Sequence, residues 1–215
     1  MARAKSLPNV VNVRDLIAHL GDVPPERIRM HPPPGTATEK DLLRLVERDK
    51  ILCELIDGVL VEKVMGVQES FLAILLARLL GDFAAKGDLG FVLGADGMAR
   101  LAPGLVRIPD VSFVSWQRVP NRRIPRVPML NFAPDLAVEI LSPSNTAREM
   151  TRKLQDYFTA GVRLVWHVDP AARTVEVFTA ADQSTLLRED QDLLGDPLLP
   201  GFVLPIRELF AQLEQ

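Results

Sequence analysis

Three acidic residues lie within otherwise apolar segments and could take part in chemistry: Glu54, Asp110 and Glu139. A carboxylate that is buried without a partner is costly, so each needs a cation, a hydrogen-bond donor or the edge of a sheet. Two carboxylates at the ends of adjacent strands would form a hard-oxygen site that suits Mg²⁺ or Mn²⁺. The structural alternative is that each acid bonds a backbone amide or an arginine.

Lys153 is the candidate cation for this site, because it lies on the helix expected after the Glu139 segment. The turn between the two contains Ser142, Pro143 and Ser144. The alternative is a surface lysine that pairs with Glu149, four residues earlier, which would contribute only ~0.3–0.5 kcal/mol. We expect Tyr157, one turn further along, to be a packing residue with a satisfied hydroxyl group.

An arginine-rich segment surrounds Asp110, although the whole chain has a formal net charge of -3 and gives no global indication of nucleic-acid binding. Asp110 is the only acidic residue between Met98 and Pro134. The segment could contact phosphates, or it could be a solvated, proline-rich loop. Its arginines are Arg100, Arg107, Arg118, Arg122, Arg123 and Arg126.

The order of helices and strands predicts an α/β fold with a mixed β-sheet flanked by helices. Thr36 and Glu39 would form a capping box, and Asp57-Gly58 between extended runs indicates a hairpin. Apolar periodicity predicts helices at residues 10–20, 39–48, 67–85, 146–160 and 205–213. Strands are expected at residues 53–56, 59–64, 90–93, 98–101, 106–115, 136–141, 162–168 and 174–179.

The composition is that of one ordinary globular domain, with 47% hydrophobic and 25% charged residues among 215. We expect residues 1–38 to be an N-terminal helical extension with a proline-rich linker, and residues 39–215 to form the domain. The longest apolar stretch is too short to cross a membrane and the N-terminus lacks a signal-peptide pattern, so a cytoplasmic location is expected. The single cysteine, Cys53, and three scattered histidines offer no zinc-ligand spacing.

A set of ordered motifs resembles the Uma-two family of restriction-endonuclease-like proteins, over residues 39–179. The motifs are Glu54-Leu-Ile-Asp57-Gly58, Pro109-Asp110, Pro134-Asp135-Leu-Ala-Val-Glu139-Ile-Leu-Ser142-Pro143-Ser144, Lys153-Leu154 with Tyr157, and Val168-Asp169-Pro170. The resemblance implies the PD-(D/E)XK nuclease core, a restriction-endonuclease-like mixed β-sheet flanked by helices. It also implies acidic residues that bind magnesium for phosphodiester hydrolysis.

Within this resemblance, Asp110 is similar to the signature aspartate, Glu139 to the signature acid and Glu54 to the upstream acid of the first core hairpin. The signature lysine would lie two residues after the acid, where this chain has Leu141. Its role therefore passes to Lys153. A second difference is Gln68, near the position at which many relatives have a histidine.

The resulting hypothesis is a metal-dependent endonuclease that acts on nucleic acid, with DNA as the expected substrate. Asp110, Glu139 and Glu54 would hold Mg²⁺ or Mn²⁺, and Lys153 would assist catalysis. We expect a homodimer, because symmetric dimers are the commonest oligomers. Two other hypotheses remain: an inactive nuclease-fold module for binding or assembly, and a metal-free scaffold.

Overall fold

The computed structural model describes residue 7 and residues 10–214, and its largest sheet is a mixed sheet of six strands. In spatial order these are β11 (Gln183–Leu187), β10 (Thr174–Ala180), β9 (Leu164–Asp169), β8 (Leu136–Ile140), β7 (Val111–Ser115) and β4 (Gly90–Leu93). Strands β8 and β9 pair in parallel, and the other neighbours pair antiparallel. This arrangement confirms the expected mixed α/β fold.

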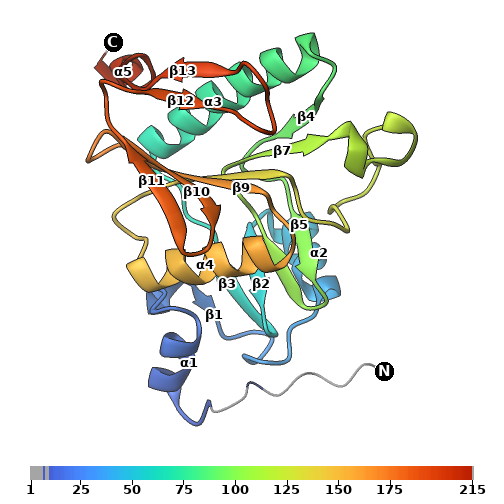
Figure 1. Cartoon of the computed structure of the whole chain (residues 1–215). Helices are drawn as coiled ribbons and strands as arrows, with labels where there is room; N and C mark the ends of the chain where they lie inside the picture. The colour runs from blue at the N-terminus through green and yellow to red at the C-terminus, as the bar shows by residue number, and fades with distance from the viewer. Residues whose placement is uncertain (1–6, 8–9, 215) are drawn as a thin grey trace.

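Helices α3 (Val67–Lys86) and α4 (Ala147–Thr159) cover opposite faces of this sheet (Figure 1). Successive side chains of a strand point to opposite faces. In β8, Val138 joins the core beneath α3, whereas Ala137 packs with Leu154 and Tyr157 of α4. The side chain of Glu139 lies on the same face as Ala137, and so it points toward α4.

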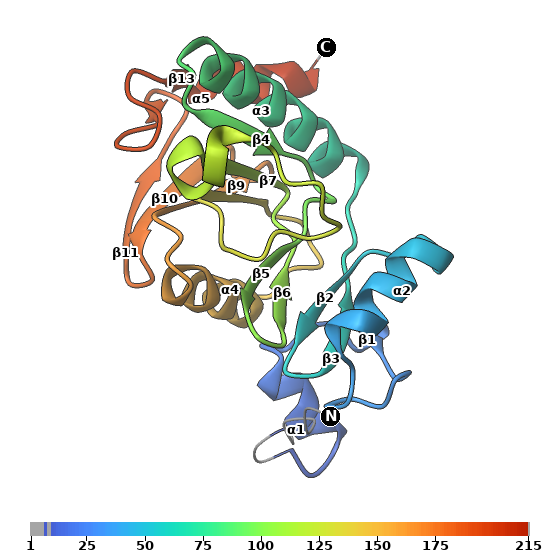
Figure 2. The same cartoon turned by 90° about the vertical axis from the view of Figure 1, so that its right-hand side faces the viewer.

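A second sheet of five antiparallel strands lies beside the first (Figure 2). Its order is β1 (Ile28–Arg29), β3 (Val59–Glu62), β2 (Cys53–Ile56), β6 (Leu105–Arg107) and β5 (Ala99–Ala102). Helix α2 (Glu39–Asp49) packs through Leu42 against one apolar cluster of this sheet, and α1 (Val13–His19) packs through Leu16 against a second apolar cluster of the same sheet. The residues before position 39 therefore contribute both a strand and a helix to this layer.

The remaining elements are short. Strands β12 (Asp192–Leu194) and β13 (Val203–Pro205) pair with each other, and α5 (Ile206–Ala211) follows them beside α3 (Figure 1). Single 3₁₀ turns are η1 (Pro25–Arg27), η2 (Trp116–Arg118), η3 (Pro120–Arg122) and η4 (Gln212–Glu214). No helix in the described part of the chain combines the length and the apolar character needed to cross a membrane.

The expectation of one strand over residues 106–115 is wrong. The chain leaves the five-stranded sheet after β6, crosses at Ile108, Pro109 and Asp110, and enters the six-stranded sheet as β7. Proline has no amide hydrogen for a sheet ladder, which explains a break at Pro109. The Asp110 amide then donates to the Val138 carbonyl at 2.9 Å, so Asp110 lies where the two sheets meet.

Two other expectations differ in detail. The capping box of α2 is formed by Thr38 and Asp41 instead of Thr36 and Glu39, and the Thr36 hydroxyl donates to the Pro33 carbonyl. Strands β1, β11, β12 and β13 were not expected, and β11 consists almost wholly of exposed residues. A strand without a buried face lacks the alternating apolar pattern by which strands are found.

The hairpin at Asp57-Gly58 is confirmed. Its geometry can be tested by replacing Gly58 with alanine and comparing the effect with the same replacement at Gly81. Gly58 has a φ of +79°, and an added Cβ would lie 2.6 Å from the Gly35 carbonyl. We expect Gly58→Ala to lower the free energy of unfolding by about 2 kcal/mol or more. The control is Gly81→Ala in α3, where a Cβ meets nothing within 4 Å and should stabilise the helix by about 0.5–1 kcal/mol. Urea unfolding would measure the change in the free energy of unfolding for both variants, and changes of the same sign would contradict the expectation.

Candidate functional site

The side chain of Asp110 is fixed at the junction of the two sheets by two groups from different segments. Its Oδ2 accepts a hydrogen bond from the Ile140 amide at 2.7 Å, and its Oδ1 is 2.8 Å from the Lys63 ammonium. Lys63 follows β3 and also donates to the Ile108 carbonyl at 2.6 Å. The side chain of Asp110 is therefore held both by the end of β8 and by the five-stranded sheet.

Glu139 lies beneath α4 and receives hydrogen bonds from two side chains of that helix. Lys153 Nζ donates to Oε2 at 2.9 Å, and the Tyr157 hydroxyl donates to Oε1 at 2.5 Å. All three side chains are almost fully buried. The alternative for Lys153, an exposed helix pair with Glu149, is excluded because Glu149 pairs with Arg27 instead.

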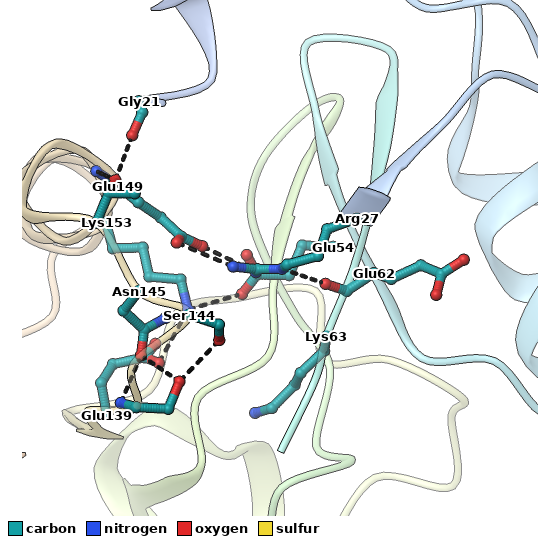
Figure 3. A network of polar contacts seen from close by, with 12 residues as sticks. Gly21, Arg27, Glu54, Glu62, Lys63, Glu139, Ser144, Asn145, Glu149 and Lys153 are labelled. Atoms are coloured by element: carbon teal, nitrogen blue, oxygen red, sulfur yellow. Dashed lines mark hydrogen bonds and ion pairs between the residues drawn. The ribbon is translucent and has the colours of Figure 1, made fainter. Parts of the chain in front are cut away.

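Glu54 lies on β2 and meets the same lysine from the other sheet (Figure 3). Its Oε1 is 3.5 Å from Lys153 Nζ and accepts from the Ile108 amide at 3.1 Å. Its Oε2 accepts from Arg107 Nη1 at 2.6 Å, and Arg107 Nη2 reaches Asp156 of α4 at 2.5 Å. Both oxygens of Glu54 are thus engaged by protein donors.

The pKa values reflect this concentration of buried charge. Burial alone would raise the pKa of Glu54, but the charges of Lys153 and Arg107 outweigh it and hold the pKa at about 2. Burial raises the pKa of Glu139 above its usual value, against the charge of Lys153. Burial also opposes the charged form of Lys153, but the carboxylates of Glu139 and Glu54 raise its pKa.

Asp110 and Glu139 line one small cavity with a volume of about 20 Å³, which is room for roughly one water molecule. Lys63 and Lys153 line it as well, together with a third acid, Glu69 of α3. Glu54 is not among its lining residues. The structure therefore brings Asp110, Glu139 and Lys153 together around a shared space, and it places Glu54 behind the lysine.

The oxygen donors at this cavity fit a hard divalent cation. Mg²⁺ in proteins is usually held by one or two carboxylates and completes its shell with water. Asp110 and Glu139 could supply the carboxylate oxygens, and the Ile140 carbonyl is the adjacent backbone donor. Among residues 10–214, no three Asp, Glu, His or Cys side chains are grouped so that they could hold a metal ion. Glu54 lies outside this cavity, and its direct participation in metal binding stays a prediction from the sequence.

Several residues of this network were missed by the sequence interpretation. The Arg27 guanidinium forms two hydrogen bonds with Glu149, at 2.9 and 3.0 Å (Figure 3). These bonds connect the first turn of α4 to η1, which precedes β1. No local pattern connects residues that lie 122 positions apart. Lys63 has no distinguishing neighbour in the sequence. Tyr157 is the packing residue with a satisfied hydroxyl group that the sequence predicts, and Glu139 is the acceptor of that hydroxyl.

The six arginines of the segment around Asp110 do not form one surface. Arg107 is only 1% exposed and pairs with Glu54 and Asp156, so the expectation that it contacts phosphate is wrong. Arg123 and Arg126 are exposed. The other three pair with nearby acids: Arg100 with Glu39, Arg118 with Asp135 and Arg122 with Asp88.

The buried position of Arg107 predicts a large effect on stability. Arg107→Met leaves Glu54 and Asp156 without their shared cation, and we expect the free energy of unfolding to fall by about 3–5 kcal/mol. Arg123→Met is the matched control on an exposed arginine, with an expected change within about 0.5 kcal/mol. Urea unfolding of both variants would measure the difference. Similar small changes would show that Arg107 is not held in this network.

Comparison with known proteins places this geometry in a family. Residues 39–207 match the family model described as "Uma2: Putative restriction endonuclease". The crystal structure of "a putative nuclease belonging to DUF820" from Anabaena variabilis is similar, with a TM-score of 0.68 and 21% sequence identity over 76% of this chain and 92% of that chain. This likeness shows a shared fold, and no curated protein matches the chain. Because the family model covers most of its length, the chain belongs to the Uma2 family.

Proposed function

We propose that this protein is a metal-dependent endonuclease that hydrolyses phosphodiester bonds of nucleic acid, with DNA as its substrate. The observation that carries the proposal is the meeting of Asp110 and Glu139 at one cavity, each carboxylate held by its own lysine. Membership of a family described as "Putative restriction endonuclease" supports it, as does the fold shared with a protein described as "a putative nuclease". A cytoplasmic homodimer, expected from the sequence, is part of the proposal.

The two acids have lone pairs to spare for a cation. An ionised carboxylate offers about four acceptor positions. Asp110 uses one for the Ile140 amide and one for Lys63, and Glu139 uses one for Lys153 and one for Tyr157. Mg²⁺ held by Asp110 and Glu139 would supply a water of lowered pKa and positive charge beside the phosphate. The hydrogen bonds to the protein fix the orientation of both carboxylates in advance.

The two lysines provide positive charge beside the reacting phosphate. An ammonium group has three hydrogens. Lys153 donates to Glu139 and forms an ion pair with Glu54, and Lys63 donates to the Ile108 carbonyl and forms an ion pair with Asp110, so each retains at least one hydrogen for a phosphate. We assign Lys153 to orienting the attacking water or balancing charge in the transition state. Lys63 takes the same charge-balancing role from the Asp110 side of the cavity.

In this proposal Glu54 is a positioning residue, and it does not have the role of third metal ligand that the sequence suggested. Its carboxylate accepts hydrogen bonds from Arg107 and the Ile108 amide, and it forms an ion pair with Lys153. These contacts position the Lys153 ammonium beside the Glu139 carboxylate. Exposed Arg123 and Arg126 are the candidates for holding flanking phosphates, a contact that positions the strand without reading its sequence.

The first test is cleavage of supercoiled plasmid and of labelled single strands in Mg²⁺ or Mn²⁺. We expect Asp110→Asn and Lys153→Met each to lower the cleavage rate by about 100-fold or more, because even outer residues of metal sites contribute 10–100-fold. Asp96→Asn, on an exposed loop, is the control and should cut at the wild-type rate. Thermal unfolding of each variant would verify that it is folded. If folded wild-type protein binds these nucleic acids and cuts none, the alternative of an inactive binding module replaces the proposal.

Metal binding can be tested without activity. A ligand that binds only the folded state stabilises it, by about 2.7 kcal/mol at 100 times its dissociation constant. We expect Mg²⁺ to raise the melting temperature of the wild type by several degrees, at roughly 2–4 °C per kcal/mol for a domain of this size. Asp110→Asn should lose this increase and Asp96→Asn should retain it. An unchanged melting temperature in wild type would favour the metal-free scaffold.

A further inference from the structure

A second, larger cavity lies directly beside the catalytic one. Its volume is about 650 Å³, within the range of ligand pockets, and it is walled by α4, β9, β10 and the turn between β8 and α4. Glu69, Ser142 and Asn145 line both cavities. A molecule held in the larger cavity would therefore lie next to a phosphate at Asp110 and Glu139.

The floor of this cavity carries a buried polar side chain without a partner. His167 of β9 pairs in register with Glu139 of β8, and it is only 5% exposed. Its Nε2 has no hydrogen-bond partner within the described structure, and its ring packs 4.7 Å from that of Phe178. Burial, and then the charge of Lys153, lower the pKa of His167 to about 4. A neutral imidazole offers one donor and one acceptor at neutral pH.

The chemistry of the walls excludes phosphate and suits a flat, uncharged ligand. The lining residues include no lysine or arginine, but they include the carboxylates of Glu69, Asp169 and Glu176. These acids would repel a phosphate, and they can accept hydrogen bonds from amino groups. The large apolar side chains of the lining are Leu141, Met150, Leu154 and Phe178.

We propose that this cavity binds one unstacked nucleobase of the substrate strand, adjacent to the scissile phosphate. The inference rests on the proposed nuclease function, which places that phosphate at the neighbouring cavity. An enzyme that holds a base in a pocket must take it out of the duplex stack, and this costs least where the nucleotide is already unpaired. The substrate class is therefore single-stranded or locally unpaired nucleic acid. The carboxylates favour bases with an exocyclic amino group over thymine.

The pocket can be tested by binding alone, with nucleosides that carry no phosphate. We expect NMR titration in metal-free buffer to show saturable shifts at Thr151 and His167, with deoxycytidine and deoxyadenosine binding at least fivefold more tightly than thymidine. Ala147→Trp places a large ring at the exposed rim of the cavity and should abolish binding. Gln155→Trp, on the same helix and outside the cavity, is the matched control. His167→Phe preserves the ring volume but removes the imidazole nitrogens, and it should weaken the binding of all three nucleosides while the carboxylates keep the preference among them.

A cleavage experiment separates this inference from the nuclease proposal. Single strands carrying one abasic site at successive positions would be cut by wild type, and we expect one position beside the cut to lower the rate about tenfold, as for a lost stacked base. Ala147→Trp should cut intact strands at that lowered rate and be indifferent to the abasic site. Normal cutting without nucleoside binding or abasic sensitivity would overturn the pocket alone. Nucleoside binding without any cutting would overturn the nuclease and leave the base pocket standing.

Discussion

Burial of several carboxylates where two sheets meet is the constraint on which the rest of this structure depends. Glu54 comes from the five-stranded sheet and Glu139 from the six-stranded one, and a buried carboxylate needs a cation or hydrogen-bond donors to stay charged. Lys153 meets both, and so α4 must lie across the junction. Arg107 of β6 pairs with Asp156 of α4, and Arg27 of η1 pairs with Glu149 of α4. These two pairs attach the helix to the five-stranded sheet and to the turn that precedes it. The charge network thereby fixes the relative position of sheets and helix.

This network explains how a lysine reaches Glu139 without following it at a spacing of two. Residues at that spacing share a face of the strand, so the usual position would direct a lysine from Leu141 toward the same side as Glu139. In this chain α4 covers that side, and its inward residues Lys153 and Tyr157 donate hydrogen bonds to the Glu139 carboxylate. The electrostatic requirement is for an ammonium near the acid, and the helix meets it from above instead of from the strand.

The sequence was informative where local residue types decide the structure. A nearly continuous apolar run rich in strand-forming residues found β8, which is buried throughout, and the Asp57-Gly58 turn found the first hairpin. It could not find the break at Pro109 from apolar character alone, although proline within a strand is a sign of interruption. It also could not tell Arg107 from Arg123, because an arginine's partner is set by tertiary packing. The pairs Arg27–Glu149 and Lys63–Asp110 join distant segments, and only the folded chain brings them together.

The separation of charge between the two cavities also bears on how an acidic protein could hold a nucleic acid. Lysines line the small cavity with the acids, whereas the large one beside it has carboxylates and no lysine or arginine. A strand placed over both would find a favourable position for a phosphate at one and for a base at the other, and the reverse placement would bring phosphate against carboxylate. Local charge of this kind sets the register of a strand even when the net charge of -3 provides no general attraction. Register at the reacting bond, more than overall affinity, is what a hydrolytic site requires.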